Sequence, residues 1–318
     1  MTSSELHGDN ASRGIPAVKQ YKEILLHVFA KTGYDYKQDF VSEDVELRKA
    51  LEDAFDLDNL SVTARQAISN GFQVGYDFAN LVFHHASADI KFLVGKYVIL
   101  GVYTADDTAP DRMVLLQQFT EKFVSNEPQG EVYLDAFARL LSHDIRNHYG
   151  PFATSCIIKN CLEFLGSSAL EHQYPNGFRA TSEQFPNWLR RKTGNGETYA
   201  FFLFPEATFP EHRLLSDFLA AIPDMAEWIN LTNDVLSYYK ERVVGREDNC
   251  YIVNDAVMLG VTEMEALEAS VRYLGVLHDR VVAVLSPKEE LLASWKNLER
   301  GFIMFHLKQE RYKLNDLF

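Results

Sequence analysis

Apolar residues recur along most of this chain with the spacing of α-helices. Near the start, the positions i, i+3, i+4, i+7 and i+8 are occupied by Tyr21, Ile24, Leu25, Val28 and Phe29, which share one face of a helix. The same spacing recurs at Leu47, Leu51, Ala54 and Phe55. Strand-like alternation is nearly absent. The same periodicity, bounded by Pro, Gly and Asn, predicts helices over 61–85, 88–105, 111–124, 131–145, 151–170, 183–203, 211–221, 224–242, 262–285 and 288–310. We therefore predict an all-α fold.

The domain organisation is predicted to be simple. No internal period recurs and no long Gly/Ser or Pro linker divides the chain, so neither a solenoid nor two domains is favoured. Residues 1–16 are rich in Ser, Gly, Asn and charge and lack the apolar core of a signal peptide, so we expect a flexible tail. Residues 17–318 are predicted to form one domain.

One predicted helix, over 88–103, is apolar on every face and should lie at the centre of the fold. It runs into Asp106 and Asp107, followed by Pro110 and Asp111. Adjacent carboxylates at the C-terminal end of a buried helix are unfavourable, because the helix dipole already places negative charge there. Either these aspartates are solvated loop residues, or a positive charge offsets them.

A second unusual helix, over 225–242, carries three oxygen-bearing side chains on one face. Asn233, Ser237 and Glu241 stand four residues apart, so they stack along a helix of about 3.6 residues per turn. Amide, hydroxyl and carboxylate oxygens suit a hard divalent cation such as Mg²⁺. A solvated helix face is the alternative, but the preceding turns are apolar nearly all round, which indicates a buried helix.

Composition narrows the choice of partners. The chain has 318 residues, is 47% hydrophobic and has a net charge of −14. This charge argues against nucleic acid or an anionic membrane as a partner, and an anionic substrate would need a metal ion. Cys156, Cys161 and Cys250 follow no metal-binding spacing and are expected to be reduced core residues. The longest apolar run, 92–103, is too short to cross a bilayer, so we expect no membrane span and a cytoplasmic protein.

The two carboxylate-bearing segments form a coherent pair if their helices face one another across a cavity, with metal at its mouth. The run from Asp106 to Asp111 resembles the aspartate-rich motif of class I terpene cyclases. The second metal-binding motif of those enzymes, Asn-Asp-x-x-Ser-x-x-x-Glu, is matched at every position by Asn233, Asp234, Ser237 and Glu241.

Two further matches narrow the resemblance to the fungal trichodiene-synthase-like sesquiterpene cyclases. The segment 185–191 is similar to the one that carries the diphosphate-sensing arginine of that family, with Arg190 in the matching place. Arg311 and Tyr312 match its Arg-Tyr pair, which binds diphosphate when the site closes. The resemblance extends over residues 60–315 and implies a class I terpenoid synthase-like helical bundle around an apolar cavity.

The resemblance also implies residue roles. Asp106 would bridge two Mg²⁺ ions, while Asn233, Ser237 and Glu241 would chelate a third. Asp107 would pair with Arg311 in the closed state. Diphosphate oxygens would be bound by Arg190, Lys240, Arg311 and Tyr312, where guanidinium forks match phosphate geometry. Lys240 also fits on its own position, because a cation beside three oxygen ligands is explained by an anion between them.

The sequence departs from the family at two places. Thr193 and Gly194 follow the sensor where the family often has an acidic or amide residue that links it to a backbone carbonyl, so this relay is expected to be differently wired. Pro110 interrupts the aspartate-rich motif, and the spacing to Asp111 is one residue longer than in Asp-Asp-x-x-Asp. Asp106 is therefore the ligand expected from that motif.

The implied reaction is a magnesium-dependent ionisation of farnesyl diphosphate, followed by cyclisation of the carbocation to a hydrocarbon or alcohol. The enzyme would be a carbon–oxygen lyase that acts on phosphates. Aromatic rings stabilise cations, and the candidates near the motifs are Phe92, Tyr97, Tyr103, Trp228 and Tyr239. For any single one of them, packing in the core is the favoured alternative. Because the family tends to dimerise, a homodimer is a further expectation.

Two other functions compete with this interpretation. A chain-elongating prenyltransferase would repeat the aspartate-rich motif on its second helix, and the Asn/Ser/Glu set therefore favours cyclisation. A non-catalytic helical scaffold would leave the motif spacings unexplained. Gly194-Asn195-Gly196 lacks the third glycine and the preceding strand of a dinucleotide loop, and His143 and His148 do not share a helix face, so a nucleotide or zinc site is not predicted.

Overall fold

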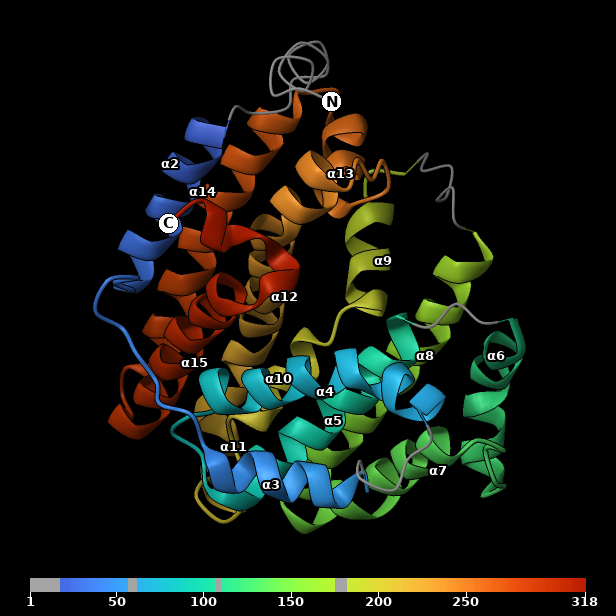
Figure 1. The fold of residues 1–318 in the computed structure, drawn as a ribbon. Coiled ribbons are helices and arrows are strands. Elements are labelled where there is room, and N and C mark those ends of the chain that lie inside the picture. The colour runs from blue at the N-terminus through green and yellow to red at the C-terminus, as the bar shows by residue number, and fades with distance from the viewer. Residues whose placement is uncertain (1–17, 57–61, 107–109, 175–181) are drawn as a thin grey trace.

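The computed structural model describes residues 18–56, 62–106, 110–174 and 182–318. All regular elements within these ranges are helices (Figure 1). The α-helices are α2 (Val18–Thr32), α3 (Val45–Ala54), α4 (Val62–Val82), α5 (Ala88–Asp106), α6 (Pro110–Ser125), α7 (Val132–Arg139), α8 (Pro151–Gln173), α9 (Phe185–Thr193), α10 (Gly196–Phe202), α11 (Glu211–Phe218), α12 (Ile222–Tyr238), α13 (Tyr251–Leu259), α14 (Glu263–Leu285) and α15 (Glu289–Lys308). Short 3₁₀ or π turns extend or follow several of them.

The apolar helix α5 lies in the core, as its composition predicts. Leu93, Val94, Ile99 and Leu100 are almost fully buried. Helix α4 packs along α5 at close range. The distance is so short at Gly75 that an added Cβ atom would lie 2.5 Å from Cγ1 of Ile99 on α5. Only a residue without a side chain permits that approach.

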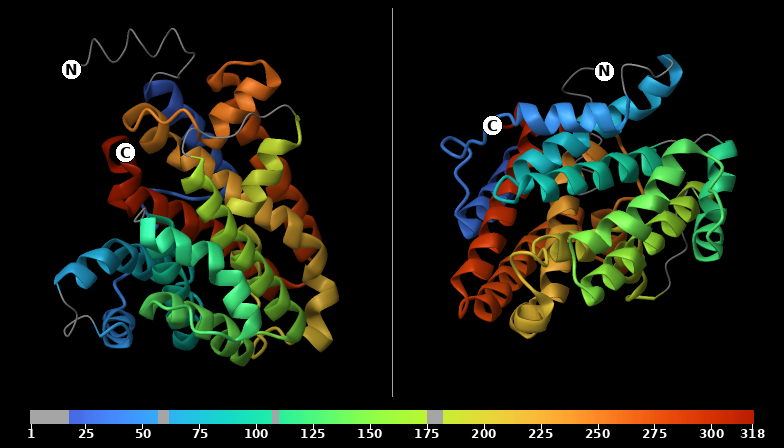
Figure 2. Two further views of the ribbon diagram at one scale, coloured as in Figure 1. Left: turned by 90° about the vertical axis from the view of Figure 1, so that its right-hand side faces the viewer. Right: turned by 90° about the horizontal axis from the view of Figure 1, so that it is seen from below.

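The remaining helices surround this pair. Helices α2, α14 and α15 lie side by side along one edge of the molecule, and α12 packs against α10, α14 and α15 (Figures 1 and 2). Helices α6 and α8 pack together at the opposite edge. The hydroxyl of Tyr21 on α2 donates to the carbonyl of Val235 on α12 over 2.7 Å, which ties the outer layer to the helix of the second motif.

Most predicted helices are present to within a few residues, but three expectations need correction. The segment 183–203 is two helices, because the chain turns at Gly194 and Asn195. The helix predicted to end at residue 242 is α-helical to Tyr238 and continues as a π turn, Tyr239–Val244. The helix predicted over 131–145 is α-helical to Arg139 and continues as a π turn and a 3₁₀ turn. In addition, helix α13 was not predicted. Apolar spacing identifies the buried face of a helix. It does not reveal where the helix changes from α to π geometry, or where a short connector interrupts it.

Two other expectations concern the ends of the chain and the membrane. The predicted tail, residues 1–16, lies outside the described residues. Among the helices that the structure describes, none combines the length and the apolar character that crossing a bilayer requires.

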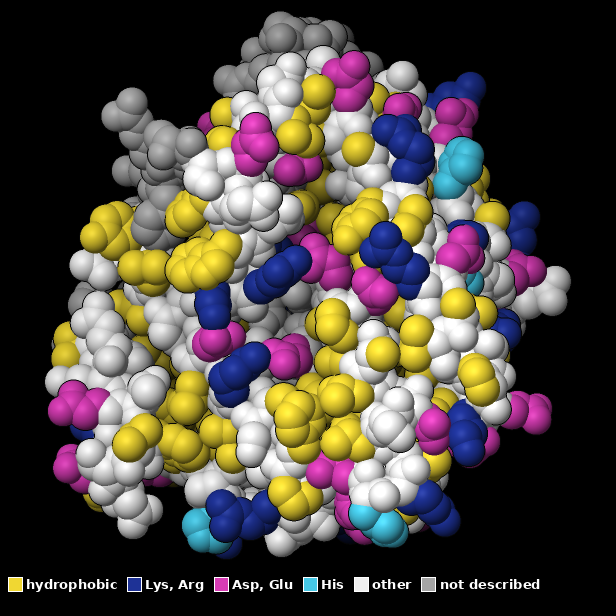
Figure 3. Space-filling view, turned by 180° about the vertical axis from the view of Figure 1, so that it is seen from behind, with side chains coloured by type: hydrophobic (Ala, Val, Ile, Leu, Met, Phe, Trp, Pro, Cys, Tyr) yellow, Lys and Arg dark blue, Asp and Glu magenta, His cyan; other side chains and the backbone are white. Residues whose placement is uncertain are grey.

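On the face of the molecule seen in Figure 3, acidic and basic side chains are interspersed, and neither sign of charge forms a patch of its own.

Candidate active site

A cavity of about 270 Å³ lies between α4 and α5 on one side and α12 and α15 on the other. Its apolar and aromatic lining includes Val74, Phe78, Val98, Val102, Phe164, Tyr199, Ile229, Phe302 and Phe305. Its polar lining comprises Arg190, Thr193, Asn195, Asn230, Asn233, His306, Arg311 and Tyr312. The cavity therefore combines a mainly apolar wall with a concentrated set of hydrogen-bond donors.

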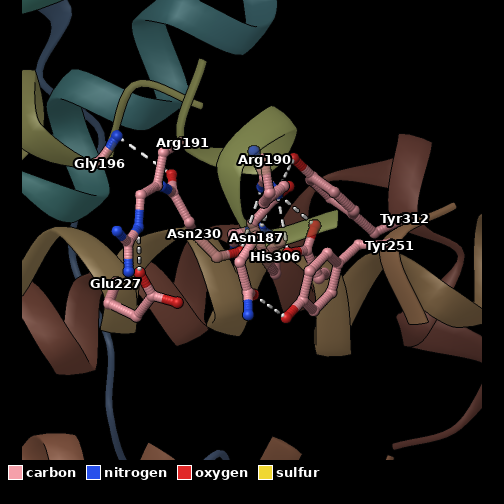
Figure 4. A network of polar contacts seen from close by, with 11 residues as sticks. Asn187, Arg190, Arg191, Gly196, Glu227, Asn230, Tyr251, His306 and Tyr312 are labelled. Atoms are coloured by element: carbon pink, nitrogen blue, oxygen red, sulfur yellow. Dashed lines mark hydrogen bonds and ion pairs between the residues drawn. The ribbon is translucent and has the colours of Figure 1, made fainter. Parts of the chain in front are cut away.

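Arg190, the predicted sensor, lies in the last turn of α9 and reaches α12. Its Nε lies 2.8 Å from each carboxylate oxygen of Asp234. One terminal nitrogen donates to the carbonyl of Asn230 over 3.1 Å and to Oδ1 of Asn233 over 3.2 Å. Figure 4 shows these contacts converging on Arg190. The second metal motif and the sensor are therefore in direct contact.

This pair is buried, and the burial affects its charges. Burial raises the pKa of Asp234 to about 6, although the charge of Arg190 opposes that shift. Burial lowers the pKa of Arg190, but the nearby charges of Asp234, Glu241 and Glu171 outweigh it, and the net shift is upward. Both groups are ionised at neutral pH, so the cavity wall holds a charged guanidinium.

The other two residues of the second motif lie further along the same helix. Ser237 is buried, and its Oγ has no hydrogen-bond partner among the described residues. Glu241 stands in the π turn that follows α12, with Oε1 3.2 Å from Nζ of Lys240. A π turn inside a helix is frequent at functional sites. A buried hydroxyl without a partner is costly, and a cation held between Asn233 and Glu241 would satisfy it, so this donor set fits Mg²⁺.

No three His, Cys, Asp or Glu side chains come together as metal ligands in the part of the chain that the structure describes. The set on α12 contains one carboxylate beside an amide and a hydroxyl, so it is not such a cluster. Asp106 is the last residue of α5, but the placement of its side chain is outside what is described, and Asp107 lies outside the described residues. Ala105, the residue before Asp106, lines the cavity.

The π turn is anchored by a second arginine–carboxylate cluster that does not line the cavity. Arg242 is buried and pairs with Glu263 at the start of α14, with nitrogen–oxygen distances of 2.8–3.1 Å. It also pairs with Asp248, and the hydroxyl of Tyr238 donates to Glu263. This second Arg–carboxylate cluster fixes the chain immediately after Glu241.

The C-terminal pair closes the cavity from a third direction. Arg311 and Tyr312 belong to a 3₁₀ turn, Glu310–Tyr312, that follows α15. The ring of Tyr312 lies against that of His306, with centroids 4.3 Å apart, and Nζ of Lys240 lies 5.6 Å from the Tyr312 ring centroid. The four predicted diphosphate-binding residues thus approach one region.

The connector between α9 and α10 brings Thr193 and Gly194 to the same cavity. The carbonyl of Gly194 accepts a 3.2 Å hydrogen bond from Asn160, and the N–H of Gly196 donates over 3.1 Å to Oδ1 of Asn230. A Cβ atom on Gly194 would lie 2.4 Å from that same oxygen. The two glycines therefore permit a close approach of the connector to α12.

None of the five predicted cavity aromatics, Phe92, Tyr97, Tyr103, Trp228 and Tyr239, lines this cavity. Two of them lie directly behind the lining residues: the Tyr97 hydroxyl donates to Oδ1 of Asn195 over 2.7 Å, and the Trp228 ring packs against Phe302. The others pack on residues outside the lining: Tyr103 lies edge-on to Tyr133, Tyr239 stacks on Tyr21, and Nζ of Lys96 lies over the Phe92 ring. Proximity to a motif in sequence is a poor guide, because neighbouring residues on a helix point in different directions.

Several residues at the cavity escaped the sequence analysis. Phe302, Phe305 and His306 come from α15, and burial lowers the pKa of His306 to about 3. The sequence does contain a signal for them: a histidine inside the apolar run 302–307, a few residues before Arg311. The two buried amides Asn160 and Asn230, which hold the connector, carried no recognisable spacing.

Comparison with known proteins identifies the class. The sequence model of the trichodiene synthase family matches residues 60–318. An (E)-beta farnesene synthase of Metarhizium brunneum is 33% identical over 225 residues, covering 69% of this chain and 68% of that protein. An alpha-cuprenene synthase of Coprinopsis cinerea is 30% identical over 254 residues, covering 79% and 76%. The chain belongs to the trichodiene synthase family of terpene synthases.

The fold agrees with this assignment. The crystal structure of 2-methylisoborneol synthase from Streptomyces coelicolor, in complex with Mg²⁺ and 2-fluoroneryl diphosphate, superposes with a TM-score of 0.62. The two chains are 16% identical, and the match covers 88% of this chain and 97% of that one. These comparisons confirm the predicted family and the all-α class I terpenoid synthase fold. They also confirm the predicted class of enzyme, a lyase that acts on prenyl diphosphates.

Proposed function

We propose that this protein is a magnesium-dependent sesquiterpene synthase that ionises farnesyl diphosphate, cyclises the resulting cation and releases diphosphate. The observation that carries the proposal is the convergence of Arg190, Asn233, Arg311 and Tyr312 on one cavity whose remaining wall is mainly apolar and aromatic. The names of the fungal relatives, which include farnesene, cuprenene and longiborneol synthases, support a fifteen-carbon substrate.

Mg²⁺ would be held by Asn233, Ser237 and Glu241 on one side of the cavity and by Asp106 on the other, with three ions in all. Bound there, the ions would neutralise the charge that develops on the departing diphosphate. Terpene synthases of this class depend on Mg²⁺, and the free oxygen of Ser237 supports the assignment for this chain.

The protein's own residues would do the rest. Arg190, Lys240, Arg311 and Tyr312 would donate hydrogen bonds to diphosphate oxygens, which stabilises the leaving group in a site from which water is excluded. Asp107 would pair with Arg311 on closure, and Asp234 would hold Arg190 in register. Thr193 and Gly194 would border the diphosphate end of the cavity.

The apolar part of the cavity would shape the carbocation. In place of the aromatic residues expected from the sequence, Phe78, Phe164, Tyr199, Phe302 and Phe305 are the rings available to it. Each ring face can stabilise a passing cation by about 0.5–2 kcal/mol. The product would be a hydrocarbon if the cation loses a proton and an alcohol if a water molecule in the cavity captures it.

The test is incubation of the purified chain with farnesyl diphosphate and Mg²⁺, followed by gas chromatography of a pentane extract. A cyclic hydrocarbon or alcohol supports the proposal, and an acyclic product would limit it to ionisation. A longer prenyl diphosphate would show chain elongation, and unchanged substrate would contradict an enzymatic role. Matched controls are Asn233→Ala and Glu241→Ala, which should lose nearly all product while their far-ultraviolet circular dichroism is unchanged.

Three coarser expectations complete the proposal. We propose one catalytic domain over residues 17–318, a cytoplasmic location and a homodimer. Sedimentation velocity across a range of protein concentrations would test the last of these, since a dimer predicts a single species of twice the chain mass.

A further inference from the structure

We infer that His306 is a positioning residue that sets the orientation of the Asn233 side-chain amide, so that its oxygen, rather than its nitrogen, is presented to the metal site. The inference rests on the proposed function, because it concerns the metal ligands of that site. It starts from two distances. Nδ1 of His306 lies 2.7 Å from the carbonyl of Phe302, and Nε2 lies 3.0 Å from Nδ2 of Asn233.

These two contacts determine which nitrogen of the ring carries the proton. A backbone carbonyl only accepts hydrogen bonds, so Nδ1 of His306 must be the protonated nitrogen. Phe302 stands four residues earlier on α15, so the helix itself supplies this acceptor. The guanidinium of Arg190 only donates hydrogen bonds, so the amide oxygen of Asn233, 3.2 Å away, must face it; the amide NH₂ then faces Nε2, which is the acceptor.

An acceptor at Nε2 selects one of the two orientations of the Asn233 amide. The NH₂ group must face His306, and Oδ1 must then point away from it. The opposite side of the amide agrees, because Oδ1 accepts a 3.2 Å hydrogen bond from Arg190. A flipped amide would place two acceptors against each other at His306 and two donors against each other at Arg190.

The consequence for the metal site follows from the chemistry of asparagine. Only the amide oxygen of Asn233 can bind a hard cation, since the amide nitrogen has no available lone pair. Groups that hold a metal ligand in its productive orientation typically change metal affinity by about 10–100-fold when they are removed. His306 is itself held by packing, with its ring against those of Phe302, Phe305 and Tyr312.

The experiment measures metal binding without turnover. Mn²⁺ binding in the presence of inorganic diphosphate is followed by electron paramagnetic resonance of the free ion, in wild type, His306→Leu and His306→Gln. We expect His306→Leu to bind Mn²⁺ about 10–100-fold more weakly. His306→Gln, whose amide oxygen can accept from Asn233, should recover a large part of that loss.

A double-mutant comparison separates orientation from a general structural role. Asn233→Asp presents an oxygen in either orientation, so adding His306→Leu to this variant should leave its Mn²⁺ affinity unchanged. An equal loss in the Asn233→Asp background would overturn the inference, as would unchanged Mn²⁺ binding in folded His306→Leu. If His306→Leu does not fold, His306→Phe, which keeps an aromatic ring but has no acceptor, takes its place in both backgrounds with the same expected and contradicting results.

The outcome is distinguishable from failure of the proposed function. A wild-type protein that binds Mn²⁺ with diphosphate but forms no terpene would contradict the proposed reaction and leave the role of His306 intact. A wild-type protein that does not bind Mn²⁺ at all would overturn the inference, because Asn233 would then not be a metal ligand.

Discussion

Two buried arginine–carboxylate pairs lie on α12 and its π turn, eight residues apart. Asp234 on α12 pairs with Arg190 from α9, and Arg242 in the π turn pairs with Glu263 from α14. Both are close pairs, with nitrogen–oxygen distances of 2.8 Å, and both are largely hidden from solvent. The two arginines differ in how many of their hydrogen-bond donors are used within the protein.

The difference is whether the arginine has donors left over. Arg242 uses Nε and both terminal nitrogens on Glu263, Asp248 and the carbonyl of Glu247. Arg190 lines the cavity and uses Nε and Nη2, while its Nη1 makes no hydrogen bond to any described residue. The saturated pair has no donor left for a ligand, whereas the unsaturated pair keeps donors that the proposed function assigns to diphosphate.

The largest loss of stability should follow the removal of one partner from the saturated pair, Arg242 and Glu263. We expect Arg242→Met to lower the free energy of unfolding by about 3–5 kcal/mol, because Glu263 would remain buried without its partner. Urea denaturation followed by circular dichroism measures it. The double variant Arg242→Met/Glu263→Leu should recover much of the loss, since no unpaired charge remains. If the double variant were as unstable as the single one, the cost would lie in packing.

The unsaturated pair should behave in the opposite way. Arg190→Lys keeps a positive charge near Asp234 but removes the guanidinium fork, and we expect kcat to fall about 100-fold, as is typical when one transition-state donor is lost. Its unfolding free energy should change far less than that of Arg242→Met. Steady-state kinetics with farnesyl diphosphate tests this, and wild-type kinetics would place the sensor elsewhere.

The position of Arg190 also depends on the connector that follows α9. A Cβ atom on Gly196 would lie 2.2 Å from the carbonyl of Ala226 on α12, so Gly196→Ala should cost about 1–3 kcal/mol of stability and lower turnover as the connector shifts. Gly166→Ala is the matched control, because nothing lies within 4 Å of the added carbon, and a helical alanine there should stabilise by up to about 1 kcal/mol. Equal thermal shifts in the two variants would contradict the prediction.

The smallest effect is expected from a third pair on the same helix. Arg191 lies 3.2 Å from Glu227, but its side chain is 68% exposed. Because exposed ion pairs contribute little, Arg191→Ala should change stability by no more than about 0.5 kcal/mol and leave kcat unchanged. A large loss of activity in this variant would mean that basic charge along α9, rather than the buried geometry of Arg190, carries the function.

The same contrast explains how far sequence reasoning reached. Asn233, Ser237 and Glu241 were recognisable because their spacing along one helix is local information. The cluster around Arg242 was not, since its partner Glu263 lies beyond a loop and another helix. His306 likewise gave no local signal for its contact with Asn233, 73 residues away.

The sequence by itself determined the helical class of the fold, the positions of most helices and the family, because periodicity and short motif spacings reside in contiguous residues. Only the tertiary structure decided which aromatic rings line the cavity, where the long helix over 183–203 breaks, and which end of the Asn233 amide faces Arg190. Those features depend on how side chains from separate helices pack, and the direction in which a buried side chain points is settled by its neighbours in space.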